Sequence, residues 1–177
     1  MSQPATVVTA LCDSAALLLL VSGAAKVRAP APTVTALRAL HVRAVRPLAR
    51  AGLARFGGAL ELALAGWVLA GGGRPAAVAL TAAYLGFAAV ALRLVAVDSS
   101  TSCGCFGTSS APVGRAHLGV CFAGAAAALA AVTEPAGAVS TLFAPDPILG
   151  AVTVVLTAAL TGAAYLCLTA LPDLLRG

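Results

Sequence analysis

Long apolar runs separated by short polar or basic segments make up most of the sequence. Each run is about 18 to 25 residues long, which is the length that a helix needs to cross the roughly 30 Å hydrocarbon core of a bilayer. The pattern predicts an all-α fold: a polytopic membrane helix bundle of about five transmembrane helices and one interfacial amphipathic helix, forming a single integral membrane domain over residues 1–177. The expected spans cover residues 6–26, 53–70, 75–97, 114–132 and 147–171.

The interfacial helix is expected between the first two spans, in a basic segment over residues 33–50. On a helical wheel its apolar residues fall on one side and its arginines on the other, which is typical of a helix lying at a membrane surface. Pro47 would end or kink it. Such a segment either binds anionic lipid or a partner, or only fixes the topology, and we favour the second interpretation. The apolar side holds Val34, Leu37, Leu40, Val45 and Leu48, and the basic side holds Arg38, Arg43, Arg46 and Arg50.

Alanine and glycine are frequent in the expected spans, and this predicts close contact between helices, because small side chains let two backbones approach each other. The second span offers Gly58 and Gly66 on either side of Leu62, and the fourth offers Gly119 and Ala123. We expect these positions to pack against neighbouring helices in one compact bundle.

The composition excludes a water-soluble protein and argues against a nucleic-acid-binding one. Hydrophobic residues make up 60% of the chain and charged residues only 10%, with a mean hydropathy of +1.00, whereas an average soluble domain has about 25% charged residues. The net charge of +5 does not indicate nucleic acid, because the basic residues cluster beside apolar segments and do not interleave with aromatic residues. They are better explained as signals of membrane orientation.

Lysine and arginine fall almost entirely on one side of the expected bundle. Because cytoplasmic segments are enriched in these residues, we expect a multi-pass protein of the plasma membrane whose chain starts outside and whose segment over residues 98–114 faces the cytoplasm. Only Arg74 would then lie outside. The residues expected inside are Lys26, Arg28, Arg38, Arg43, Arg46, Arg50, Arg55, Arg93, Arg115 and Arg176.

The segment over residues 98–114 holds the strongest candidate for chemistry, a pair of cysteines in a loop rich in glycine and serine. Cys103 and Cys105 are separated by a single glycine, and a disulfide across that spacing would be strained and therefore easily reduced. We favour electron exchange over a static bridge or two inert thiols, which stay as alternatives. The positive end of the following helix, with Arg115 and His117, would favour a reactive thiolate.

Two further cysteines, Cys121 and Cys167, are expected in the half of the bilayer that contains this loop. Either could receive electrons from the loop pair, although single cysteines within spans are more often small packing residues. The loop pair, His117 and one of these cysteines could in principle hold zinc or copper, but the spacing does not match the usual C-x2-C ligands, so we expect no metal site. Cys12 is expected in the opposite half, away from any exchange.

Two acidic residues are expected inside spans, where a charge is costly unless it is paired or used. Glu61 lies at a depth similar to that of Lys26 at the end of the first span. We expect an ion pair between them that locks the first two spans together, in preference to a role in proton transfer. Asp13 lies in the outer half with no nearby cation except Arg74, so it is either protonated or hydrogen-bonded to neighbouring serine or threonine.

Three sequence elements together resemble the MauE family of methylamine-utilisation membrane proteins, which is related to DoxX. The resemblance covers roughly residues 6–132, and the CGCFG element is its most specific part. The three elements are Ser22-Gly23-Ala24-Ala25-Lys26 at the end of the first span, Glu61-Leu62-Ala63-Leu64-Ala65-Gly66 in the second, and the loop Ser102-Cys103-Gly104-Cys105-Phe106-Gly107.

This resemblance implies a redox-associated membrane protein, since the family is linked to maturation of a disulfide-rich periplasmic enzyme subunit, often alongside thioredoxin-like proteins. It makes Cys103 and Cys105 the candidate exchange pair and Lys26 with Glu61 a shared framework. A separate partner would supply the thioredoxin-like domain, because none is fused here. The implied periplasmic role and the cytoplasmic loop expected from the charges stay as alternatives for the orientation.

The leading hypothesis is a membrane thiol–disulfide relay, an oxidoreductase that supports disulfide formation or maturation of a partner protein. Its expected partners are the lipid bilayer and a thioredoxin-like or other disulfide-exchanging protein. A quinone would fit inside such a bundle, but no residue pattern indicates one, and we expect no cofactor. The alternative is a non-enzymatic membrane scaffold or a small-solute carrier in which the cysteines only shape the loop.

Overall fold

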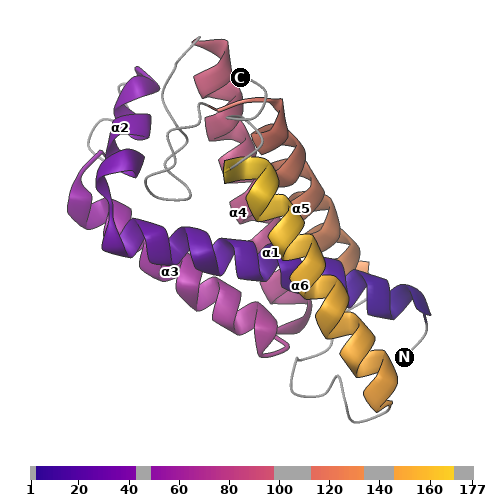
Figure 1. The fold of residues 1–177 in the computed structure, drawn as a ribbon. Coiled ribbons are helices and arrows are strands. Elements are labelled where there is room, and N and C mark those ends of the chain that lie inside the picture. The colour runs from indigo at the N-terminus through magenta and orange to yellow at the C-terminus, as the bar shows by residue number, and fades with distance from the viewer. Residues whose placement is uncertain (1–2, 43–48, 98–112, 134–145, 170–177) are drawn as a thin grey trace.

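The computed structural model describes residues 3–42, 49–97, 113–133 and 146–169, and the regular structure in these ranges is entirely α-helical. The first helix lies between the third and the sixth, and the remaining long helices complete the bundle (Figure 1). The prediction of an all-α bundle is confirmed. Its elements are α1 (Gln3–Arg28), α2 (Ala31–Ala39), α3 (Ala51–Leu69), α4 (Gly73–Ala96), α5 (Arg115–Thr133) and α6 (Pro147–Thr169).

Five of these helices are long and apolar enough to cross a membrane: α1, α3, α4, α5 and α6. Each begins and ends within three residues of a span expected from the sequence. The agreement is close because hydrocarbon thickness fixes both the length and the apolar character of a spanning helix. The chain is therefore a multi-pass membrane protein.

Helix α1 is the centre of the bundle. Of the residues in its apolar window, 61% are buried inside the protein, against 17% to 33% for the other four spans. Small side chains such as Ala10, Cys12, Ala15 and Ala16 are buried along its length, and small residues allow neighbouring backbones to come close. Helices α3, α5 and α6 consequently pack directly on α1.

Tyr84 connects α4 to two neighbouring helices. Its hydroxyl donates a buried hydrogen bond of 2.7 Å to the carbonyl oxygen of Ala15 on α1. Its ring lies against Gly124 on α5, where an added Cβ would come within 2.5 Å of the ring, and it meets the edge of Phe87 at a centroid distance of 5.9 Å. One aromatic side chain therefore fixes the position of α4 against both α1 and α5.

Replacing Tyr84 with phenylalanine should lower the stability of the protein by about 1 kcal/mol, because the change removes the hydroxyl and leaves the buried carbonyl of Ala15 with one fewer donor. Replacement with leucine should cost more, since it also removes the ring that packs on Gly124. The thermal unfolding midpoints of the purified variants in lipid nanodiscs measure both effects. A phenylalanine variant as unstable as the leucine variant would contradict this ranking.

Helix α2 is shorter than the predicted segment over residues 33–50. It ends at Ala39 because the backbone of His41 adopts a left-handed conformation, with φ of +53°, and such a residue terminates a helix. Residues 43–48 lie outside the described ranges. Leu40 is buried and Arg38 is exposed, so the helix has the apolar and the basic side that were predicted. Its apolar side, however, packs against the protein and not against the membrane surface.

Some of the small residues that were predicted to lie at contacts between helices do not lie there. Gly66, Gly119 and Ala123 are exposed, and an added Cβ would meet no atom within 4 Å at either of these glycines. Among the predicted positions Gly58 on α3 does make a tight approach, and Gly124 on α5, which was not predicted, makes another. Small residues favour close packing, but lipid is also apolar, so a small residue by itself does not reveal which face of a helix meets protein.

Candidate functional site

Helices α1 and α3 cross at two glycines that touch backbone to backbone. A Cβ added to Gly23 would lie 2.7 Å from the carbonyl oxygen of Gly58, and a Cβ added to Gly58 would lie 2.7 Å from the carbonyl oxygen of Gly23. No side chain fits at that distance without separating the helices. The crossing therefore depends on glycine at both positions.

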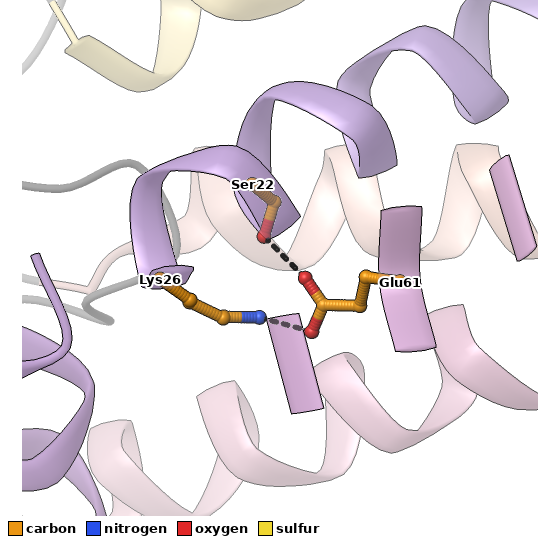
Figure 2. A network of polar contacts seen from close by, with 3 residues as sticks. All are labelled: Ser22, Lys26 and Glu61. Carbon is orange, nitrogen blue, oxygen red and sulfur yellow. Dashed lines mark hydrogen bonds and ion pairs between the residues drawn. The ribbon is translucent and has the colours of Figure 1, made fainter. Parts of the chain in front are cut away.

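An ion pair lies beside this crossing, three residues beyond each glycine. Residues three apart on a helix share a face, so Lys26 on α1 and Glu61 on α3 are brought together by the same close approach. Figure 2 shows the ammonium Nζ of Lys26 donating to Oε1 of Glu61, and Oγ of Ser22 donating to Oε2 over 3.1 Å. Both carboxylate oxygens consequently have a hydrogen-bond donor.

The pair is almost completely buried inside the protein: 7% of the Lys26 side chain and 13% of the Glu61 side chain are exposed. The Lys26 nitrogen also lies 4.6 Å from the centroid of the Phe87 ring on α4, a distance at which a cation is attracted to the face of an aromatic ring. Mutual pairing and these extra contacts offset the cost of burying two charges. The expected ion pair is present, and it joins α1, α3 and α4 into one unit.

The candidate exchange residues Cys103 and Cys105 lie outside the described residues. The described ends of the two helices that flank them, α4 and α5, are held together by an apolar cluster. This cluster combines the last turns of α4, the start of α5 and helix α2, so the ends of three elements meet at one end of the bundle. Its buried members are Ala36, Leu40, Ala91, Leu94 and Val113, and Leu118 packs against them.

The predicted supporting residues occupy different environments. Arg115 is exposed at the first position of α5, and His117 is buried with its Nδ1 lacking a hydrogen-bond partner among the described residues. Cys121 is half-buried one turn further along α5, whereas Cys167 is exposed on α6. Arg115, His117 and Cys121 thus lie within two turns at the start of α5. Nothing in the described part of the chain places Cys167 with them.

A polar contact between α1 and α6 was not predicted from the sequence. Oγ of Ser14 lies 2.7 Å from the carbonyl oxygen of Ala10 and 3.2 Å from that of Thr157, and Oγ1 of Thr157 donates to the Ala10 carbonyl over 3.4 Å. The available signal was a threonine at every fourth position of α6, which puts Thr153, Thr157 and Thr161 on one face of an otherwise apolar helix. Hydroxyl groups therefore connect the first span to the last.

Asp13 immediately precedes Ser14 on α1 and is 2% exposed. Among the described residues, its Oδ1 has no hydrogen-bond partner and it forms no ion pair. The one cation considered from the sequence, Arg74, is exposed at the start of α4. Two alternatives were expected for Asp13, protonation or hydrogen bonding to neighbouring serine or threonine. No such hydrogen bond reaches Oδ1 in the described part of the chain. Cys12, the preceding residue, is a buried free thiol.

One comparison with known proteins gives a match. A family model described as methylamine utilisation protein MauE matches residues 4–133. The matched region covers more than two thirds of the chain and contains the Lys26–Glu61 pair and the Cys103–Cys105 sequence. No curated protein and no solved structure matches.

Proposed function

The chain belongs to the MauE family, and on this basis we propose that it is a thiol–disulfide redox relay of the plasma membrane that supports disulfide formation or maturation in a partner protein. The observation that carries the proposal is that the region matched to the family includes two cysteines one residue apart, Cys103 and Cys105. The partner is a thioredoxin-like or other disulfide-exchanging protein.

The reaction is a two-step exchange of sulfur–sulfur bonds. A thiolate from Cys103 or Cys105 attacks one sulfur of the partner's disulfide, forming a mixed disulfide, and the partner's other sulfur leaves as a thiolate that takes up a proton. The second loop cysteine then loses its proton and attacks the mixed disulfide. The partner is released as a dithiol and the loop closes as a disulfide, so two electrons pass to the partner. Run in reverse, the same steps form a disulfide in the partner.

The surrounding framework suits such a loop. The ends of α4 and α5 that flank it are packed together and against α2, which gives the intervening segment fixed attachment points. Arg115 is exposed at the positive end of the α5 helix dipole, and both a cation and a helix N-terminus favour the thiolate form of a nearby cysteine. The buried Lys26–Glu61 pair is bonded to itself and to Ser22 inside the protein, so we assign it a structural role.

Replacing both Cys103 and Cys105 with serine should reduce thiol–disulfide exchange to the background rate, because serine cannot form the mixed disulfide. The measurement follows the redox state of a thioredoxin-like protein mixed with the purified chain in liposomes, by alkylation and gel shift. Replacing only one loop cysteine should trap the mixed disulfide. The control variant carries Cys12→Ala, Cys121→Ala and Cys167→Ala with the loop intact, and it should keep the wild-type rate.

Unchanged exchange in the double serine variant would overturn the relay and favour the scaffold or carrier in which the cysteines only shape the loop. The control variant also reports the orientation, because its loop cysteines are the only thiols left. Labelling by a membrane-impermeant maleimide in intact cells would place the loop outside, as the periplasmic role implies. Labelling only after permeabilisation would place it in the cytoplasm, as the charge distribution predicts.

A further inference from the structure

Asp13 and Glu61 are the two acidic residues within the described spans, and their surroundings are opposite. Glu61 receives hydrogen bonds from Lys26 and Ser22 on its two carboxylate oxygens. Asp13 is more deeply buried, at 2% exposure, and its Oδ1 has no partner in the part of the chain that the structure describes. An unpaired negative charge in the hydrocarbon region costs several kcal/mol, so ionising Asp13 is much more costly than ionising Glu61.

The hydroxyl groups of the neighbouring seam are already committed as donors. Ser14 and Thr157 donate to main-chain carbonyl oxygens of α1 and α6, and Thr153 donates to the carbonyl oxygen of Leu149 over 2.8 Å. A hydroxyl has a single proton to donate but can still accept. The contact that begins at Ser14, the residue after Asp13, therefore has acceptors but no free hydroxyl donors among these three side chains, whereas an ionised carboxylate needs donors.

Charged groups on the helices packed against α1 do not compensate for Asp13. On α3, Arg55 is exposed and Glu61 is paired with Lys26. On α4, Arg74 and Arg93 are exposed, and the Tyr84 hydroxyl donates to the Ala15 carbonyl. On α5, Arg115 is exposed, and His117 lies at the same end of the helix, next to the apolar cluster shared with α2 and α4. The titratable residues of α6, Tyr165 and Cys167, are exposed near its C-terminal end. Cys12 is the one titratable neighbour on α1 itself, and it lines a different contact, with Val68, Ala76 and Ala131.

We propose that Asp13 is a proton-binding site inside the membrane, a neutral carboxylic acid buried on α1 next to Ser14. A protonated carboxyl group carries no net charge and needs fewer donors than a carboxylate, which matches a deeply buried side chain whose Oδ1 receives no hydrogen bond from the described residues. A metal cation would instead need several oxygen ligands around it, and the serine and threonine hydroxyls nearby point their protons at carbonyl oxygens that would have to serve as those ligands. The proposal is independent of the cysteine relay.

Infrared spectroscopy of the full chain in lipid nanodiscs at neutral pH tests this site, because a protonated carboxylic acid has a carbonyl stretching band separate from those of carboxylates and amides. Protein grown with carboxyl-¹³C aspartate should show that band shifted relative to unlabelled protein. The band should be absent from Asp13→Asn. It should persist in Asp146→Asn, the matched control, because Asp146 is exposed and caps the start of α6 through Oδ1.

The conservative variant Asp13→Glu guards against misfolding of Asp13→Asn. In it the acid band should remain but no longer respond to the aspartate label, because the acid is now glutamic. Absence of a label-sensitive acid band in the wild-type protein would overturn the proposal, as would its survival in Asp13→Asn. Loss of the wild-type band on addition of sodium chloride would also overturn it, since the site would then bind the metal cation in place of the proton.

Discussion

Replacing Glu61 with glutamine will destabilise the protein by about 3 to 5 kcal/mol, the typical cost of removing one partner from a buried ion pair. Glutamine keeps the size of the side chain and an acceptor for Ser22, but it leaves the ammonium group of Lys26 without a countercharge. The Lys26 side chain is only 7% exposed, so its ammonium group cannot regain full hydration. The thermal unfolding midpoint of the purified variant in nanodiscs measures the loss.

A double-mutant cycle separates the pair from its surroundings. Lys26→Met should also destabilise the protein, because it leaves Glu61 charged and removes the contact with Phe87. The combined variant Lys26→Met with Glu61→Gln should lose less stability than the sum of the two single changes, since neither charge is then left alone. Strict additivity would mean that the two side chains do not interact, contrary to the observed contact.

Replacing Gly58 with alanine should cost about 1 to 3 kcal/mol, the usual effect of inserting an extra methyl group into a filled contact. The new Cβ would meet the carbonyl oxygen of Gly23 at 2.7 Å and the Cβ of Lys26 at 2.9 Å. Since the obstacle on α1 is backbone, the helices must separate, and this would also loosen the adjacent ion pair. The same unfolding assay measures the change.

The neighbouring glycine provides a matched control for this prediction. Gly57 belongs to the same helix turn, but an added Cβ there would meet nothing within 4 Å. Gly57→Ala should therefore leave the stability unchanged or raise it by up to about 1 kcal/mol, because alanine is the better helix former. Equal losses at Gly57 and Gly58 would show that helix propensity or lipid contact, and not the crossing of α1 and α3, sets the effect.

The number and placement of the spans could be predicted from the sequence because they depend on a quantity that a single chain reveals, the length of each apolar run. The Lys26–Glu61 pair could be expected for a related reason. Each residue has a definite depth in its span, and a buried charge needs an opposite charge at the same depth. Depth follows from counting residues, so the sequence was informative about both.

The lateral arrangement of the helices could not be predicted in the same way. Gly57 and Gly58 are the same residue type at adjacent positions, yet of the two only Gly58 contacts α1. Which face of a helix meets protein depends on the neighbouring helices, and the lipid-facing side is not marked by polar residues as the water-facing side of a soluble helix would be. The position of α1 at the centre was hidden for the same reason. The α1–α6 hydrogen bonds join residues 143 and 147 positions apart, and no local pattern encodes such pairing. The cysteine pair lies outside the described residues.

The central position of α1 has a consequence for how the protein is made. Helix α1 leaves the ribosome before the other described helices, but α6, which covers its hydroxyl-bearing side through Ser14, is complete only after 141 further residues, from Arg28 to Thr169. At about 5 to 20 residues per second, that interval is roughly 7 to 30 s. The crossing with α3 becomes available much earlier. We therefore expect the first two spans to pair before the later helices are made, held by the glycine contact and the ion pair, so that the later helices assemble on them.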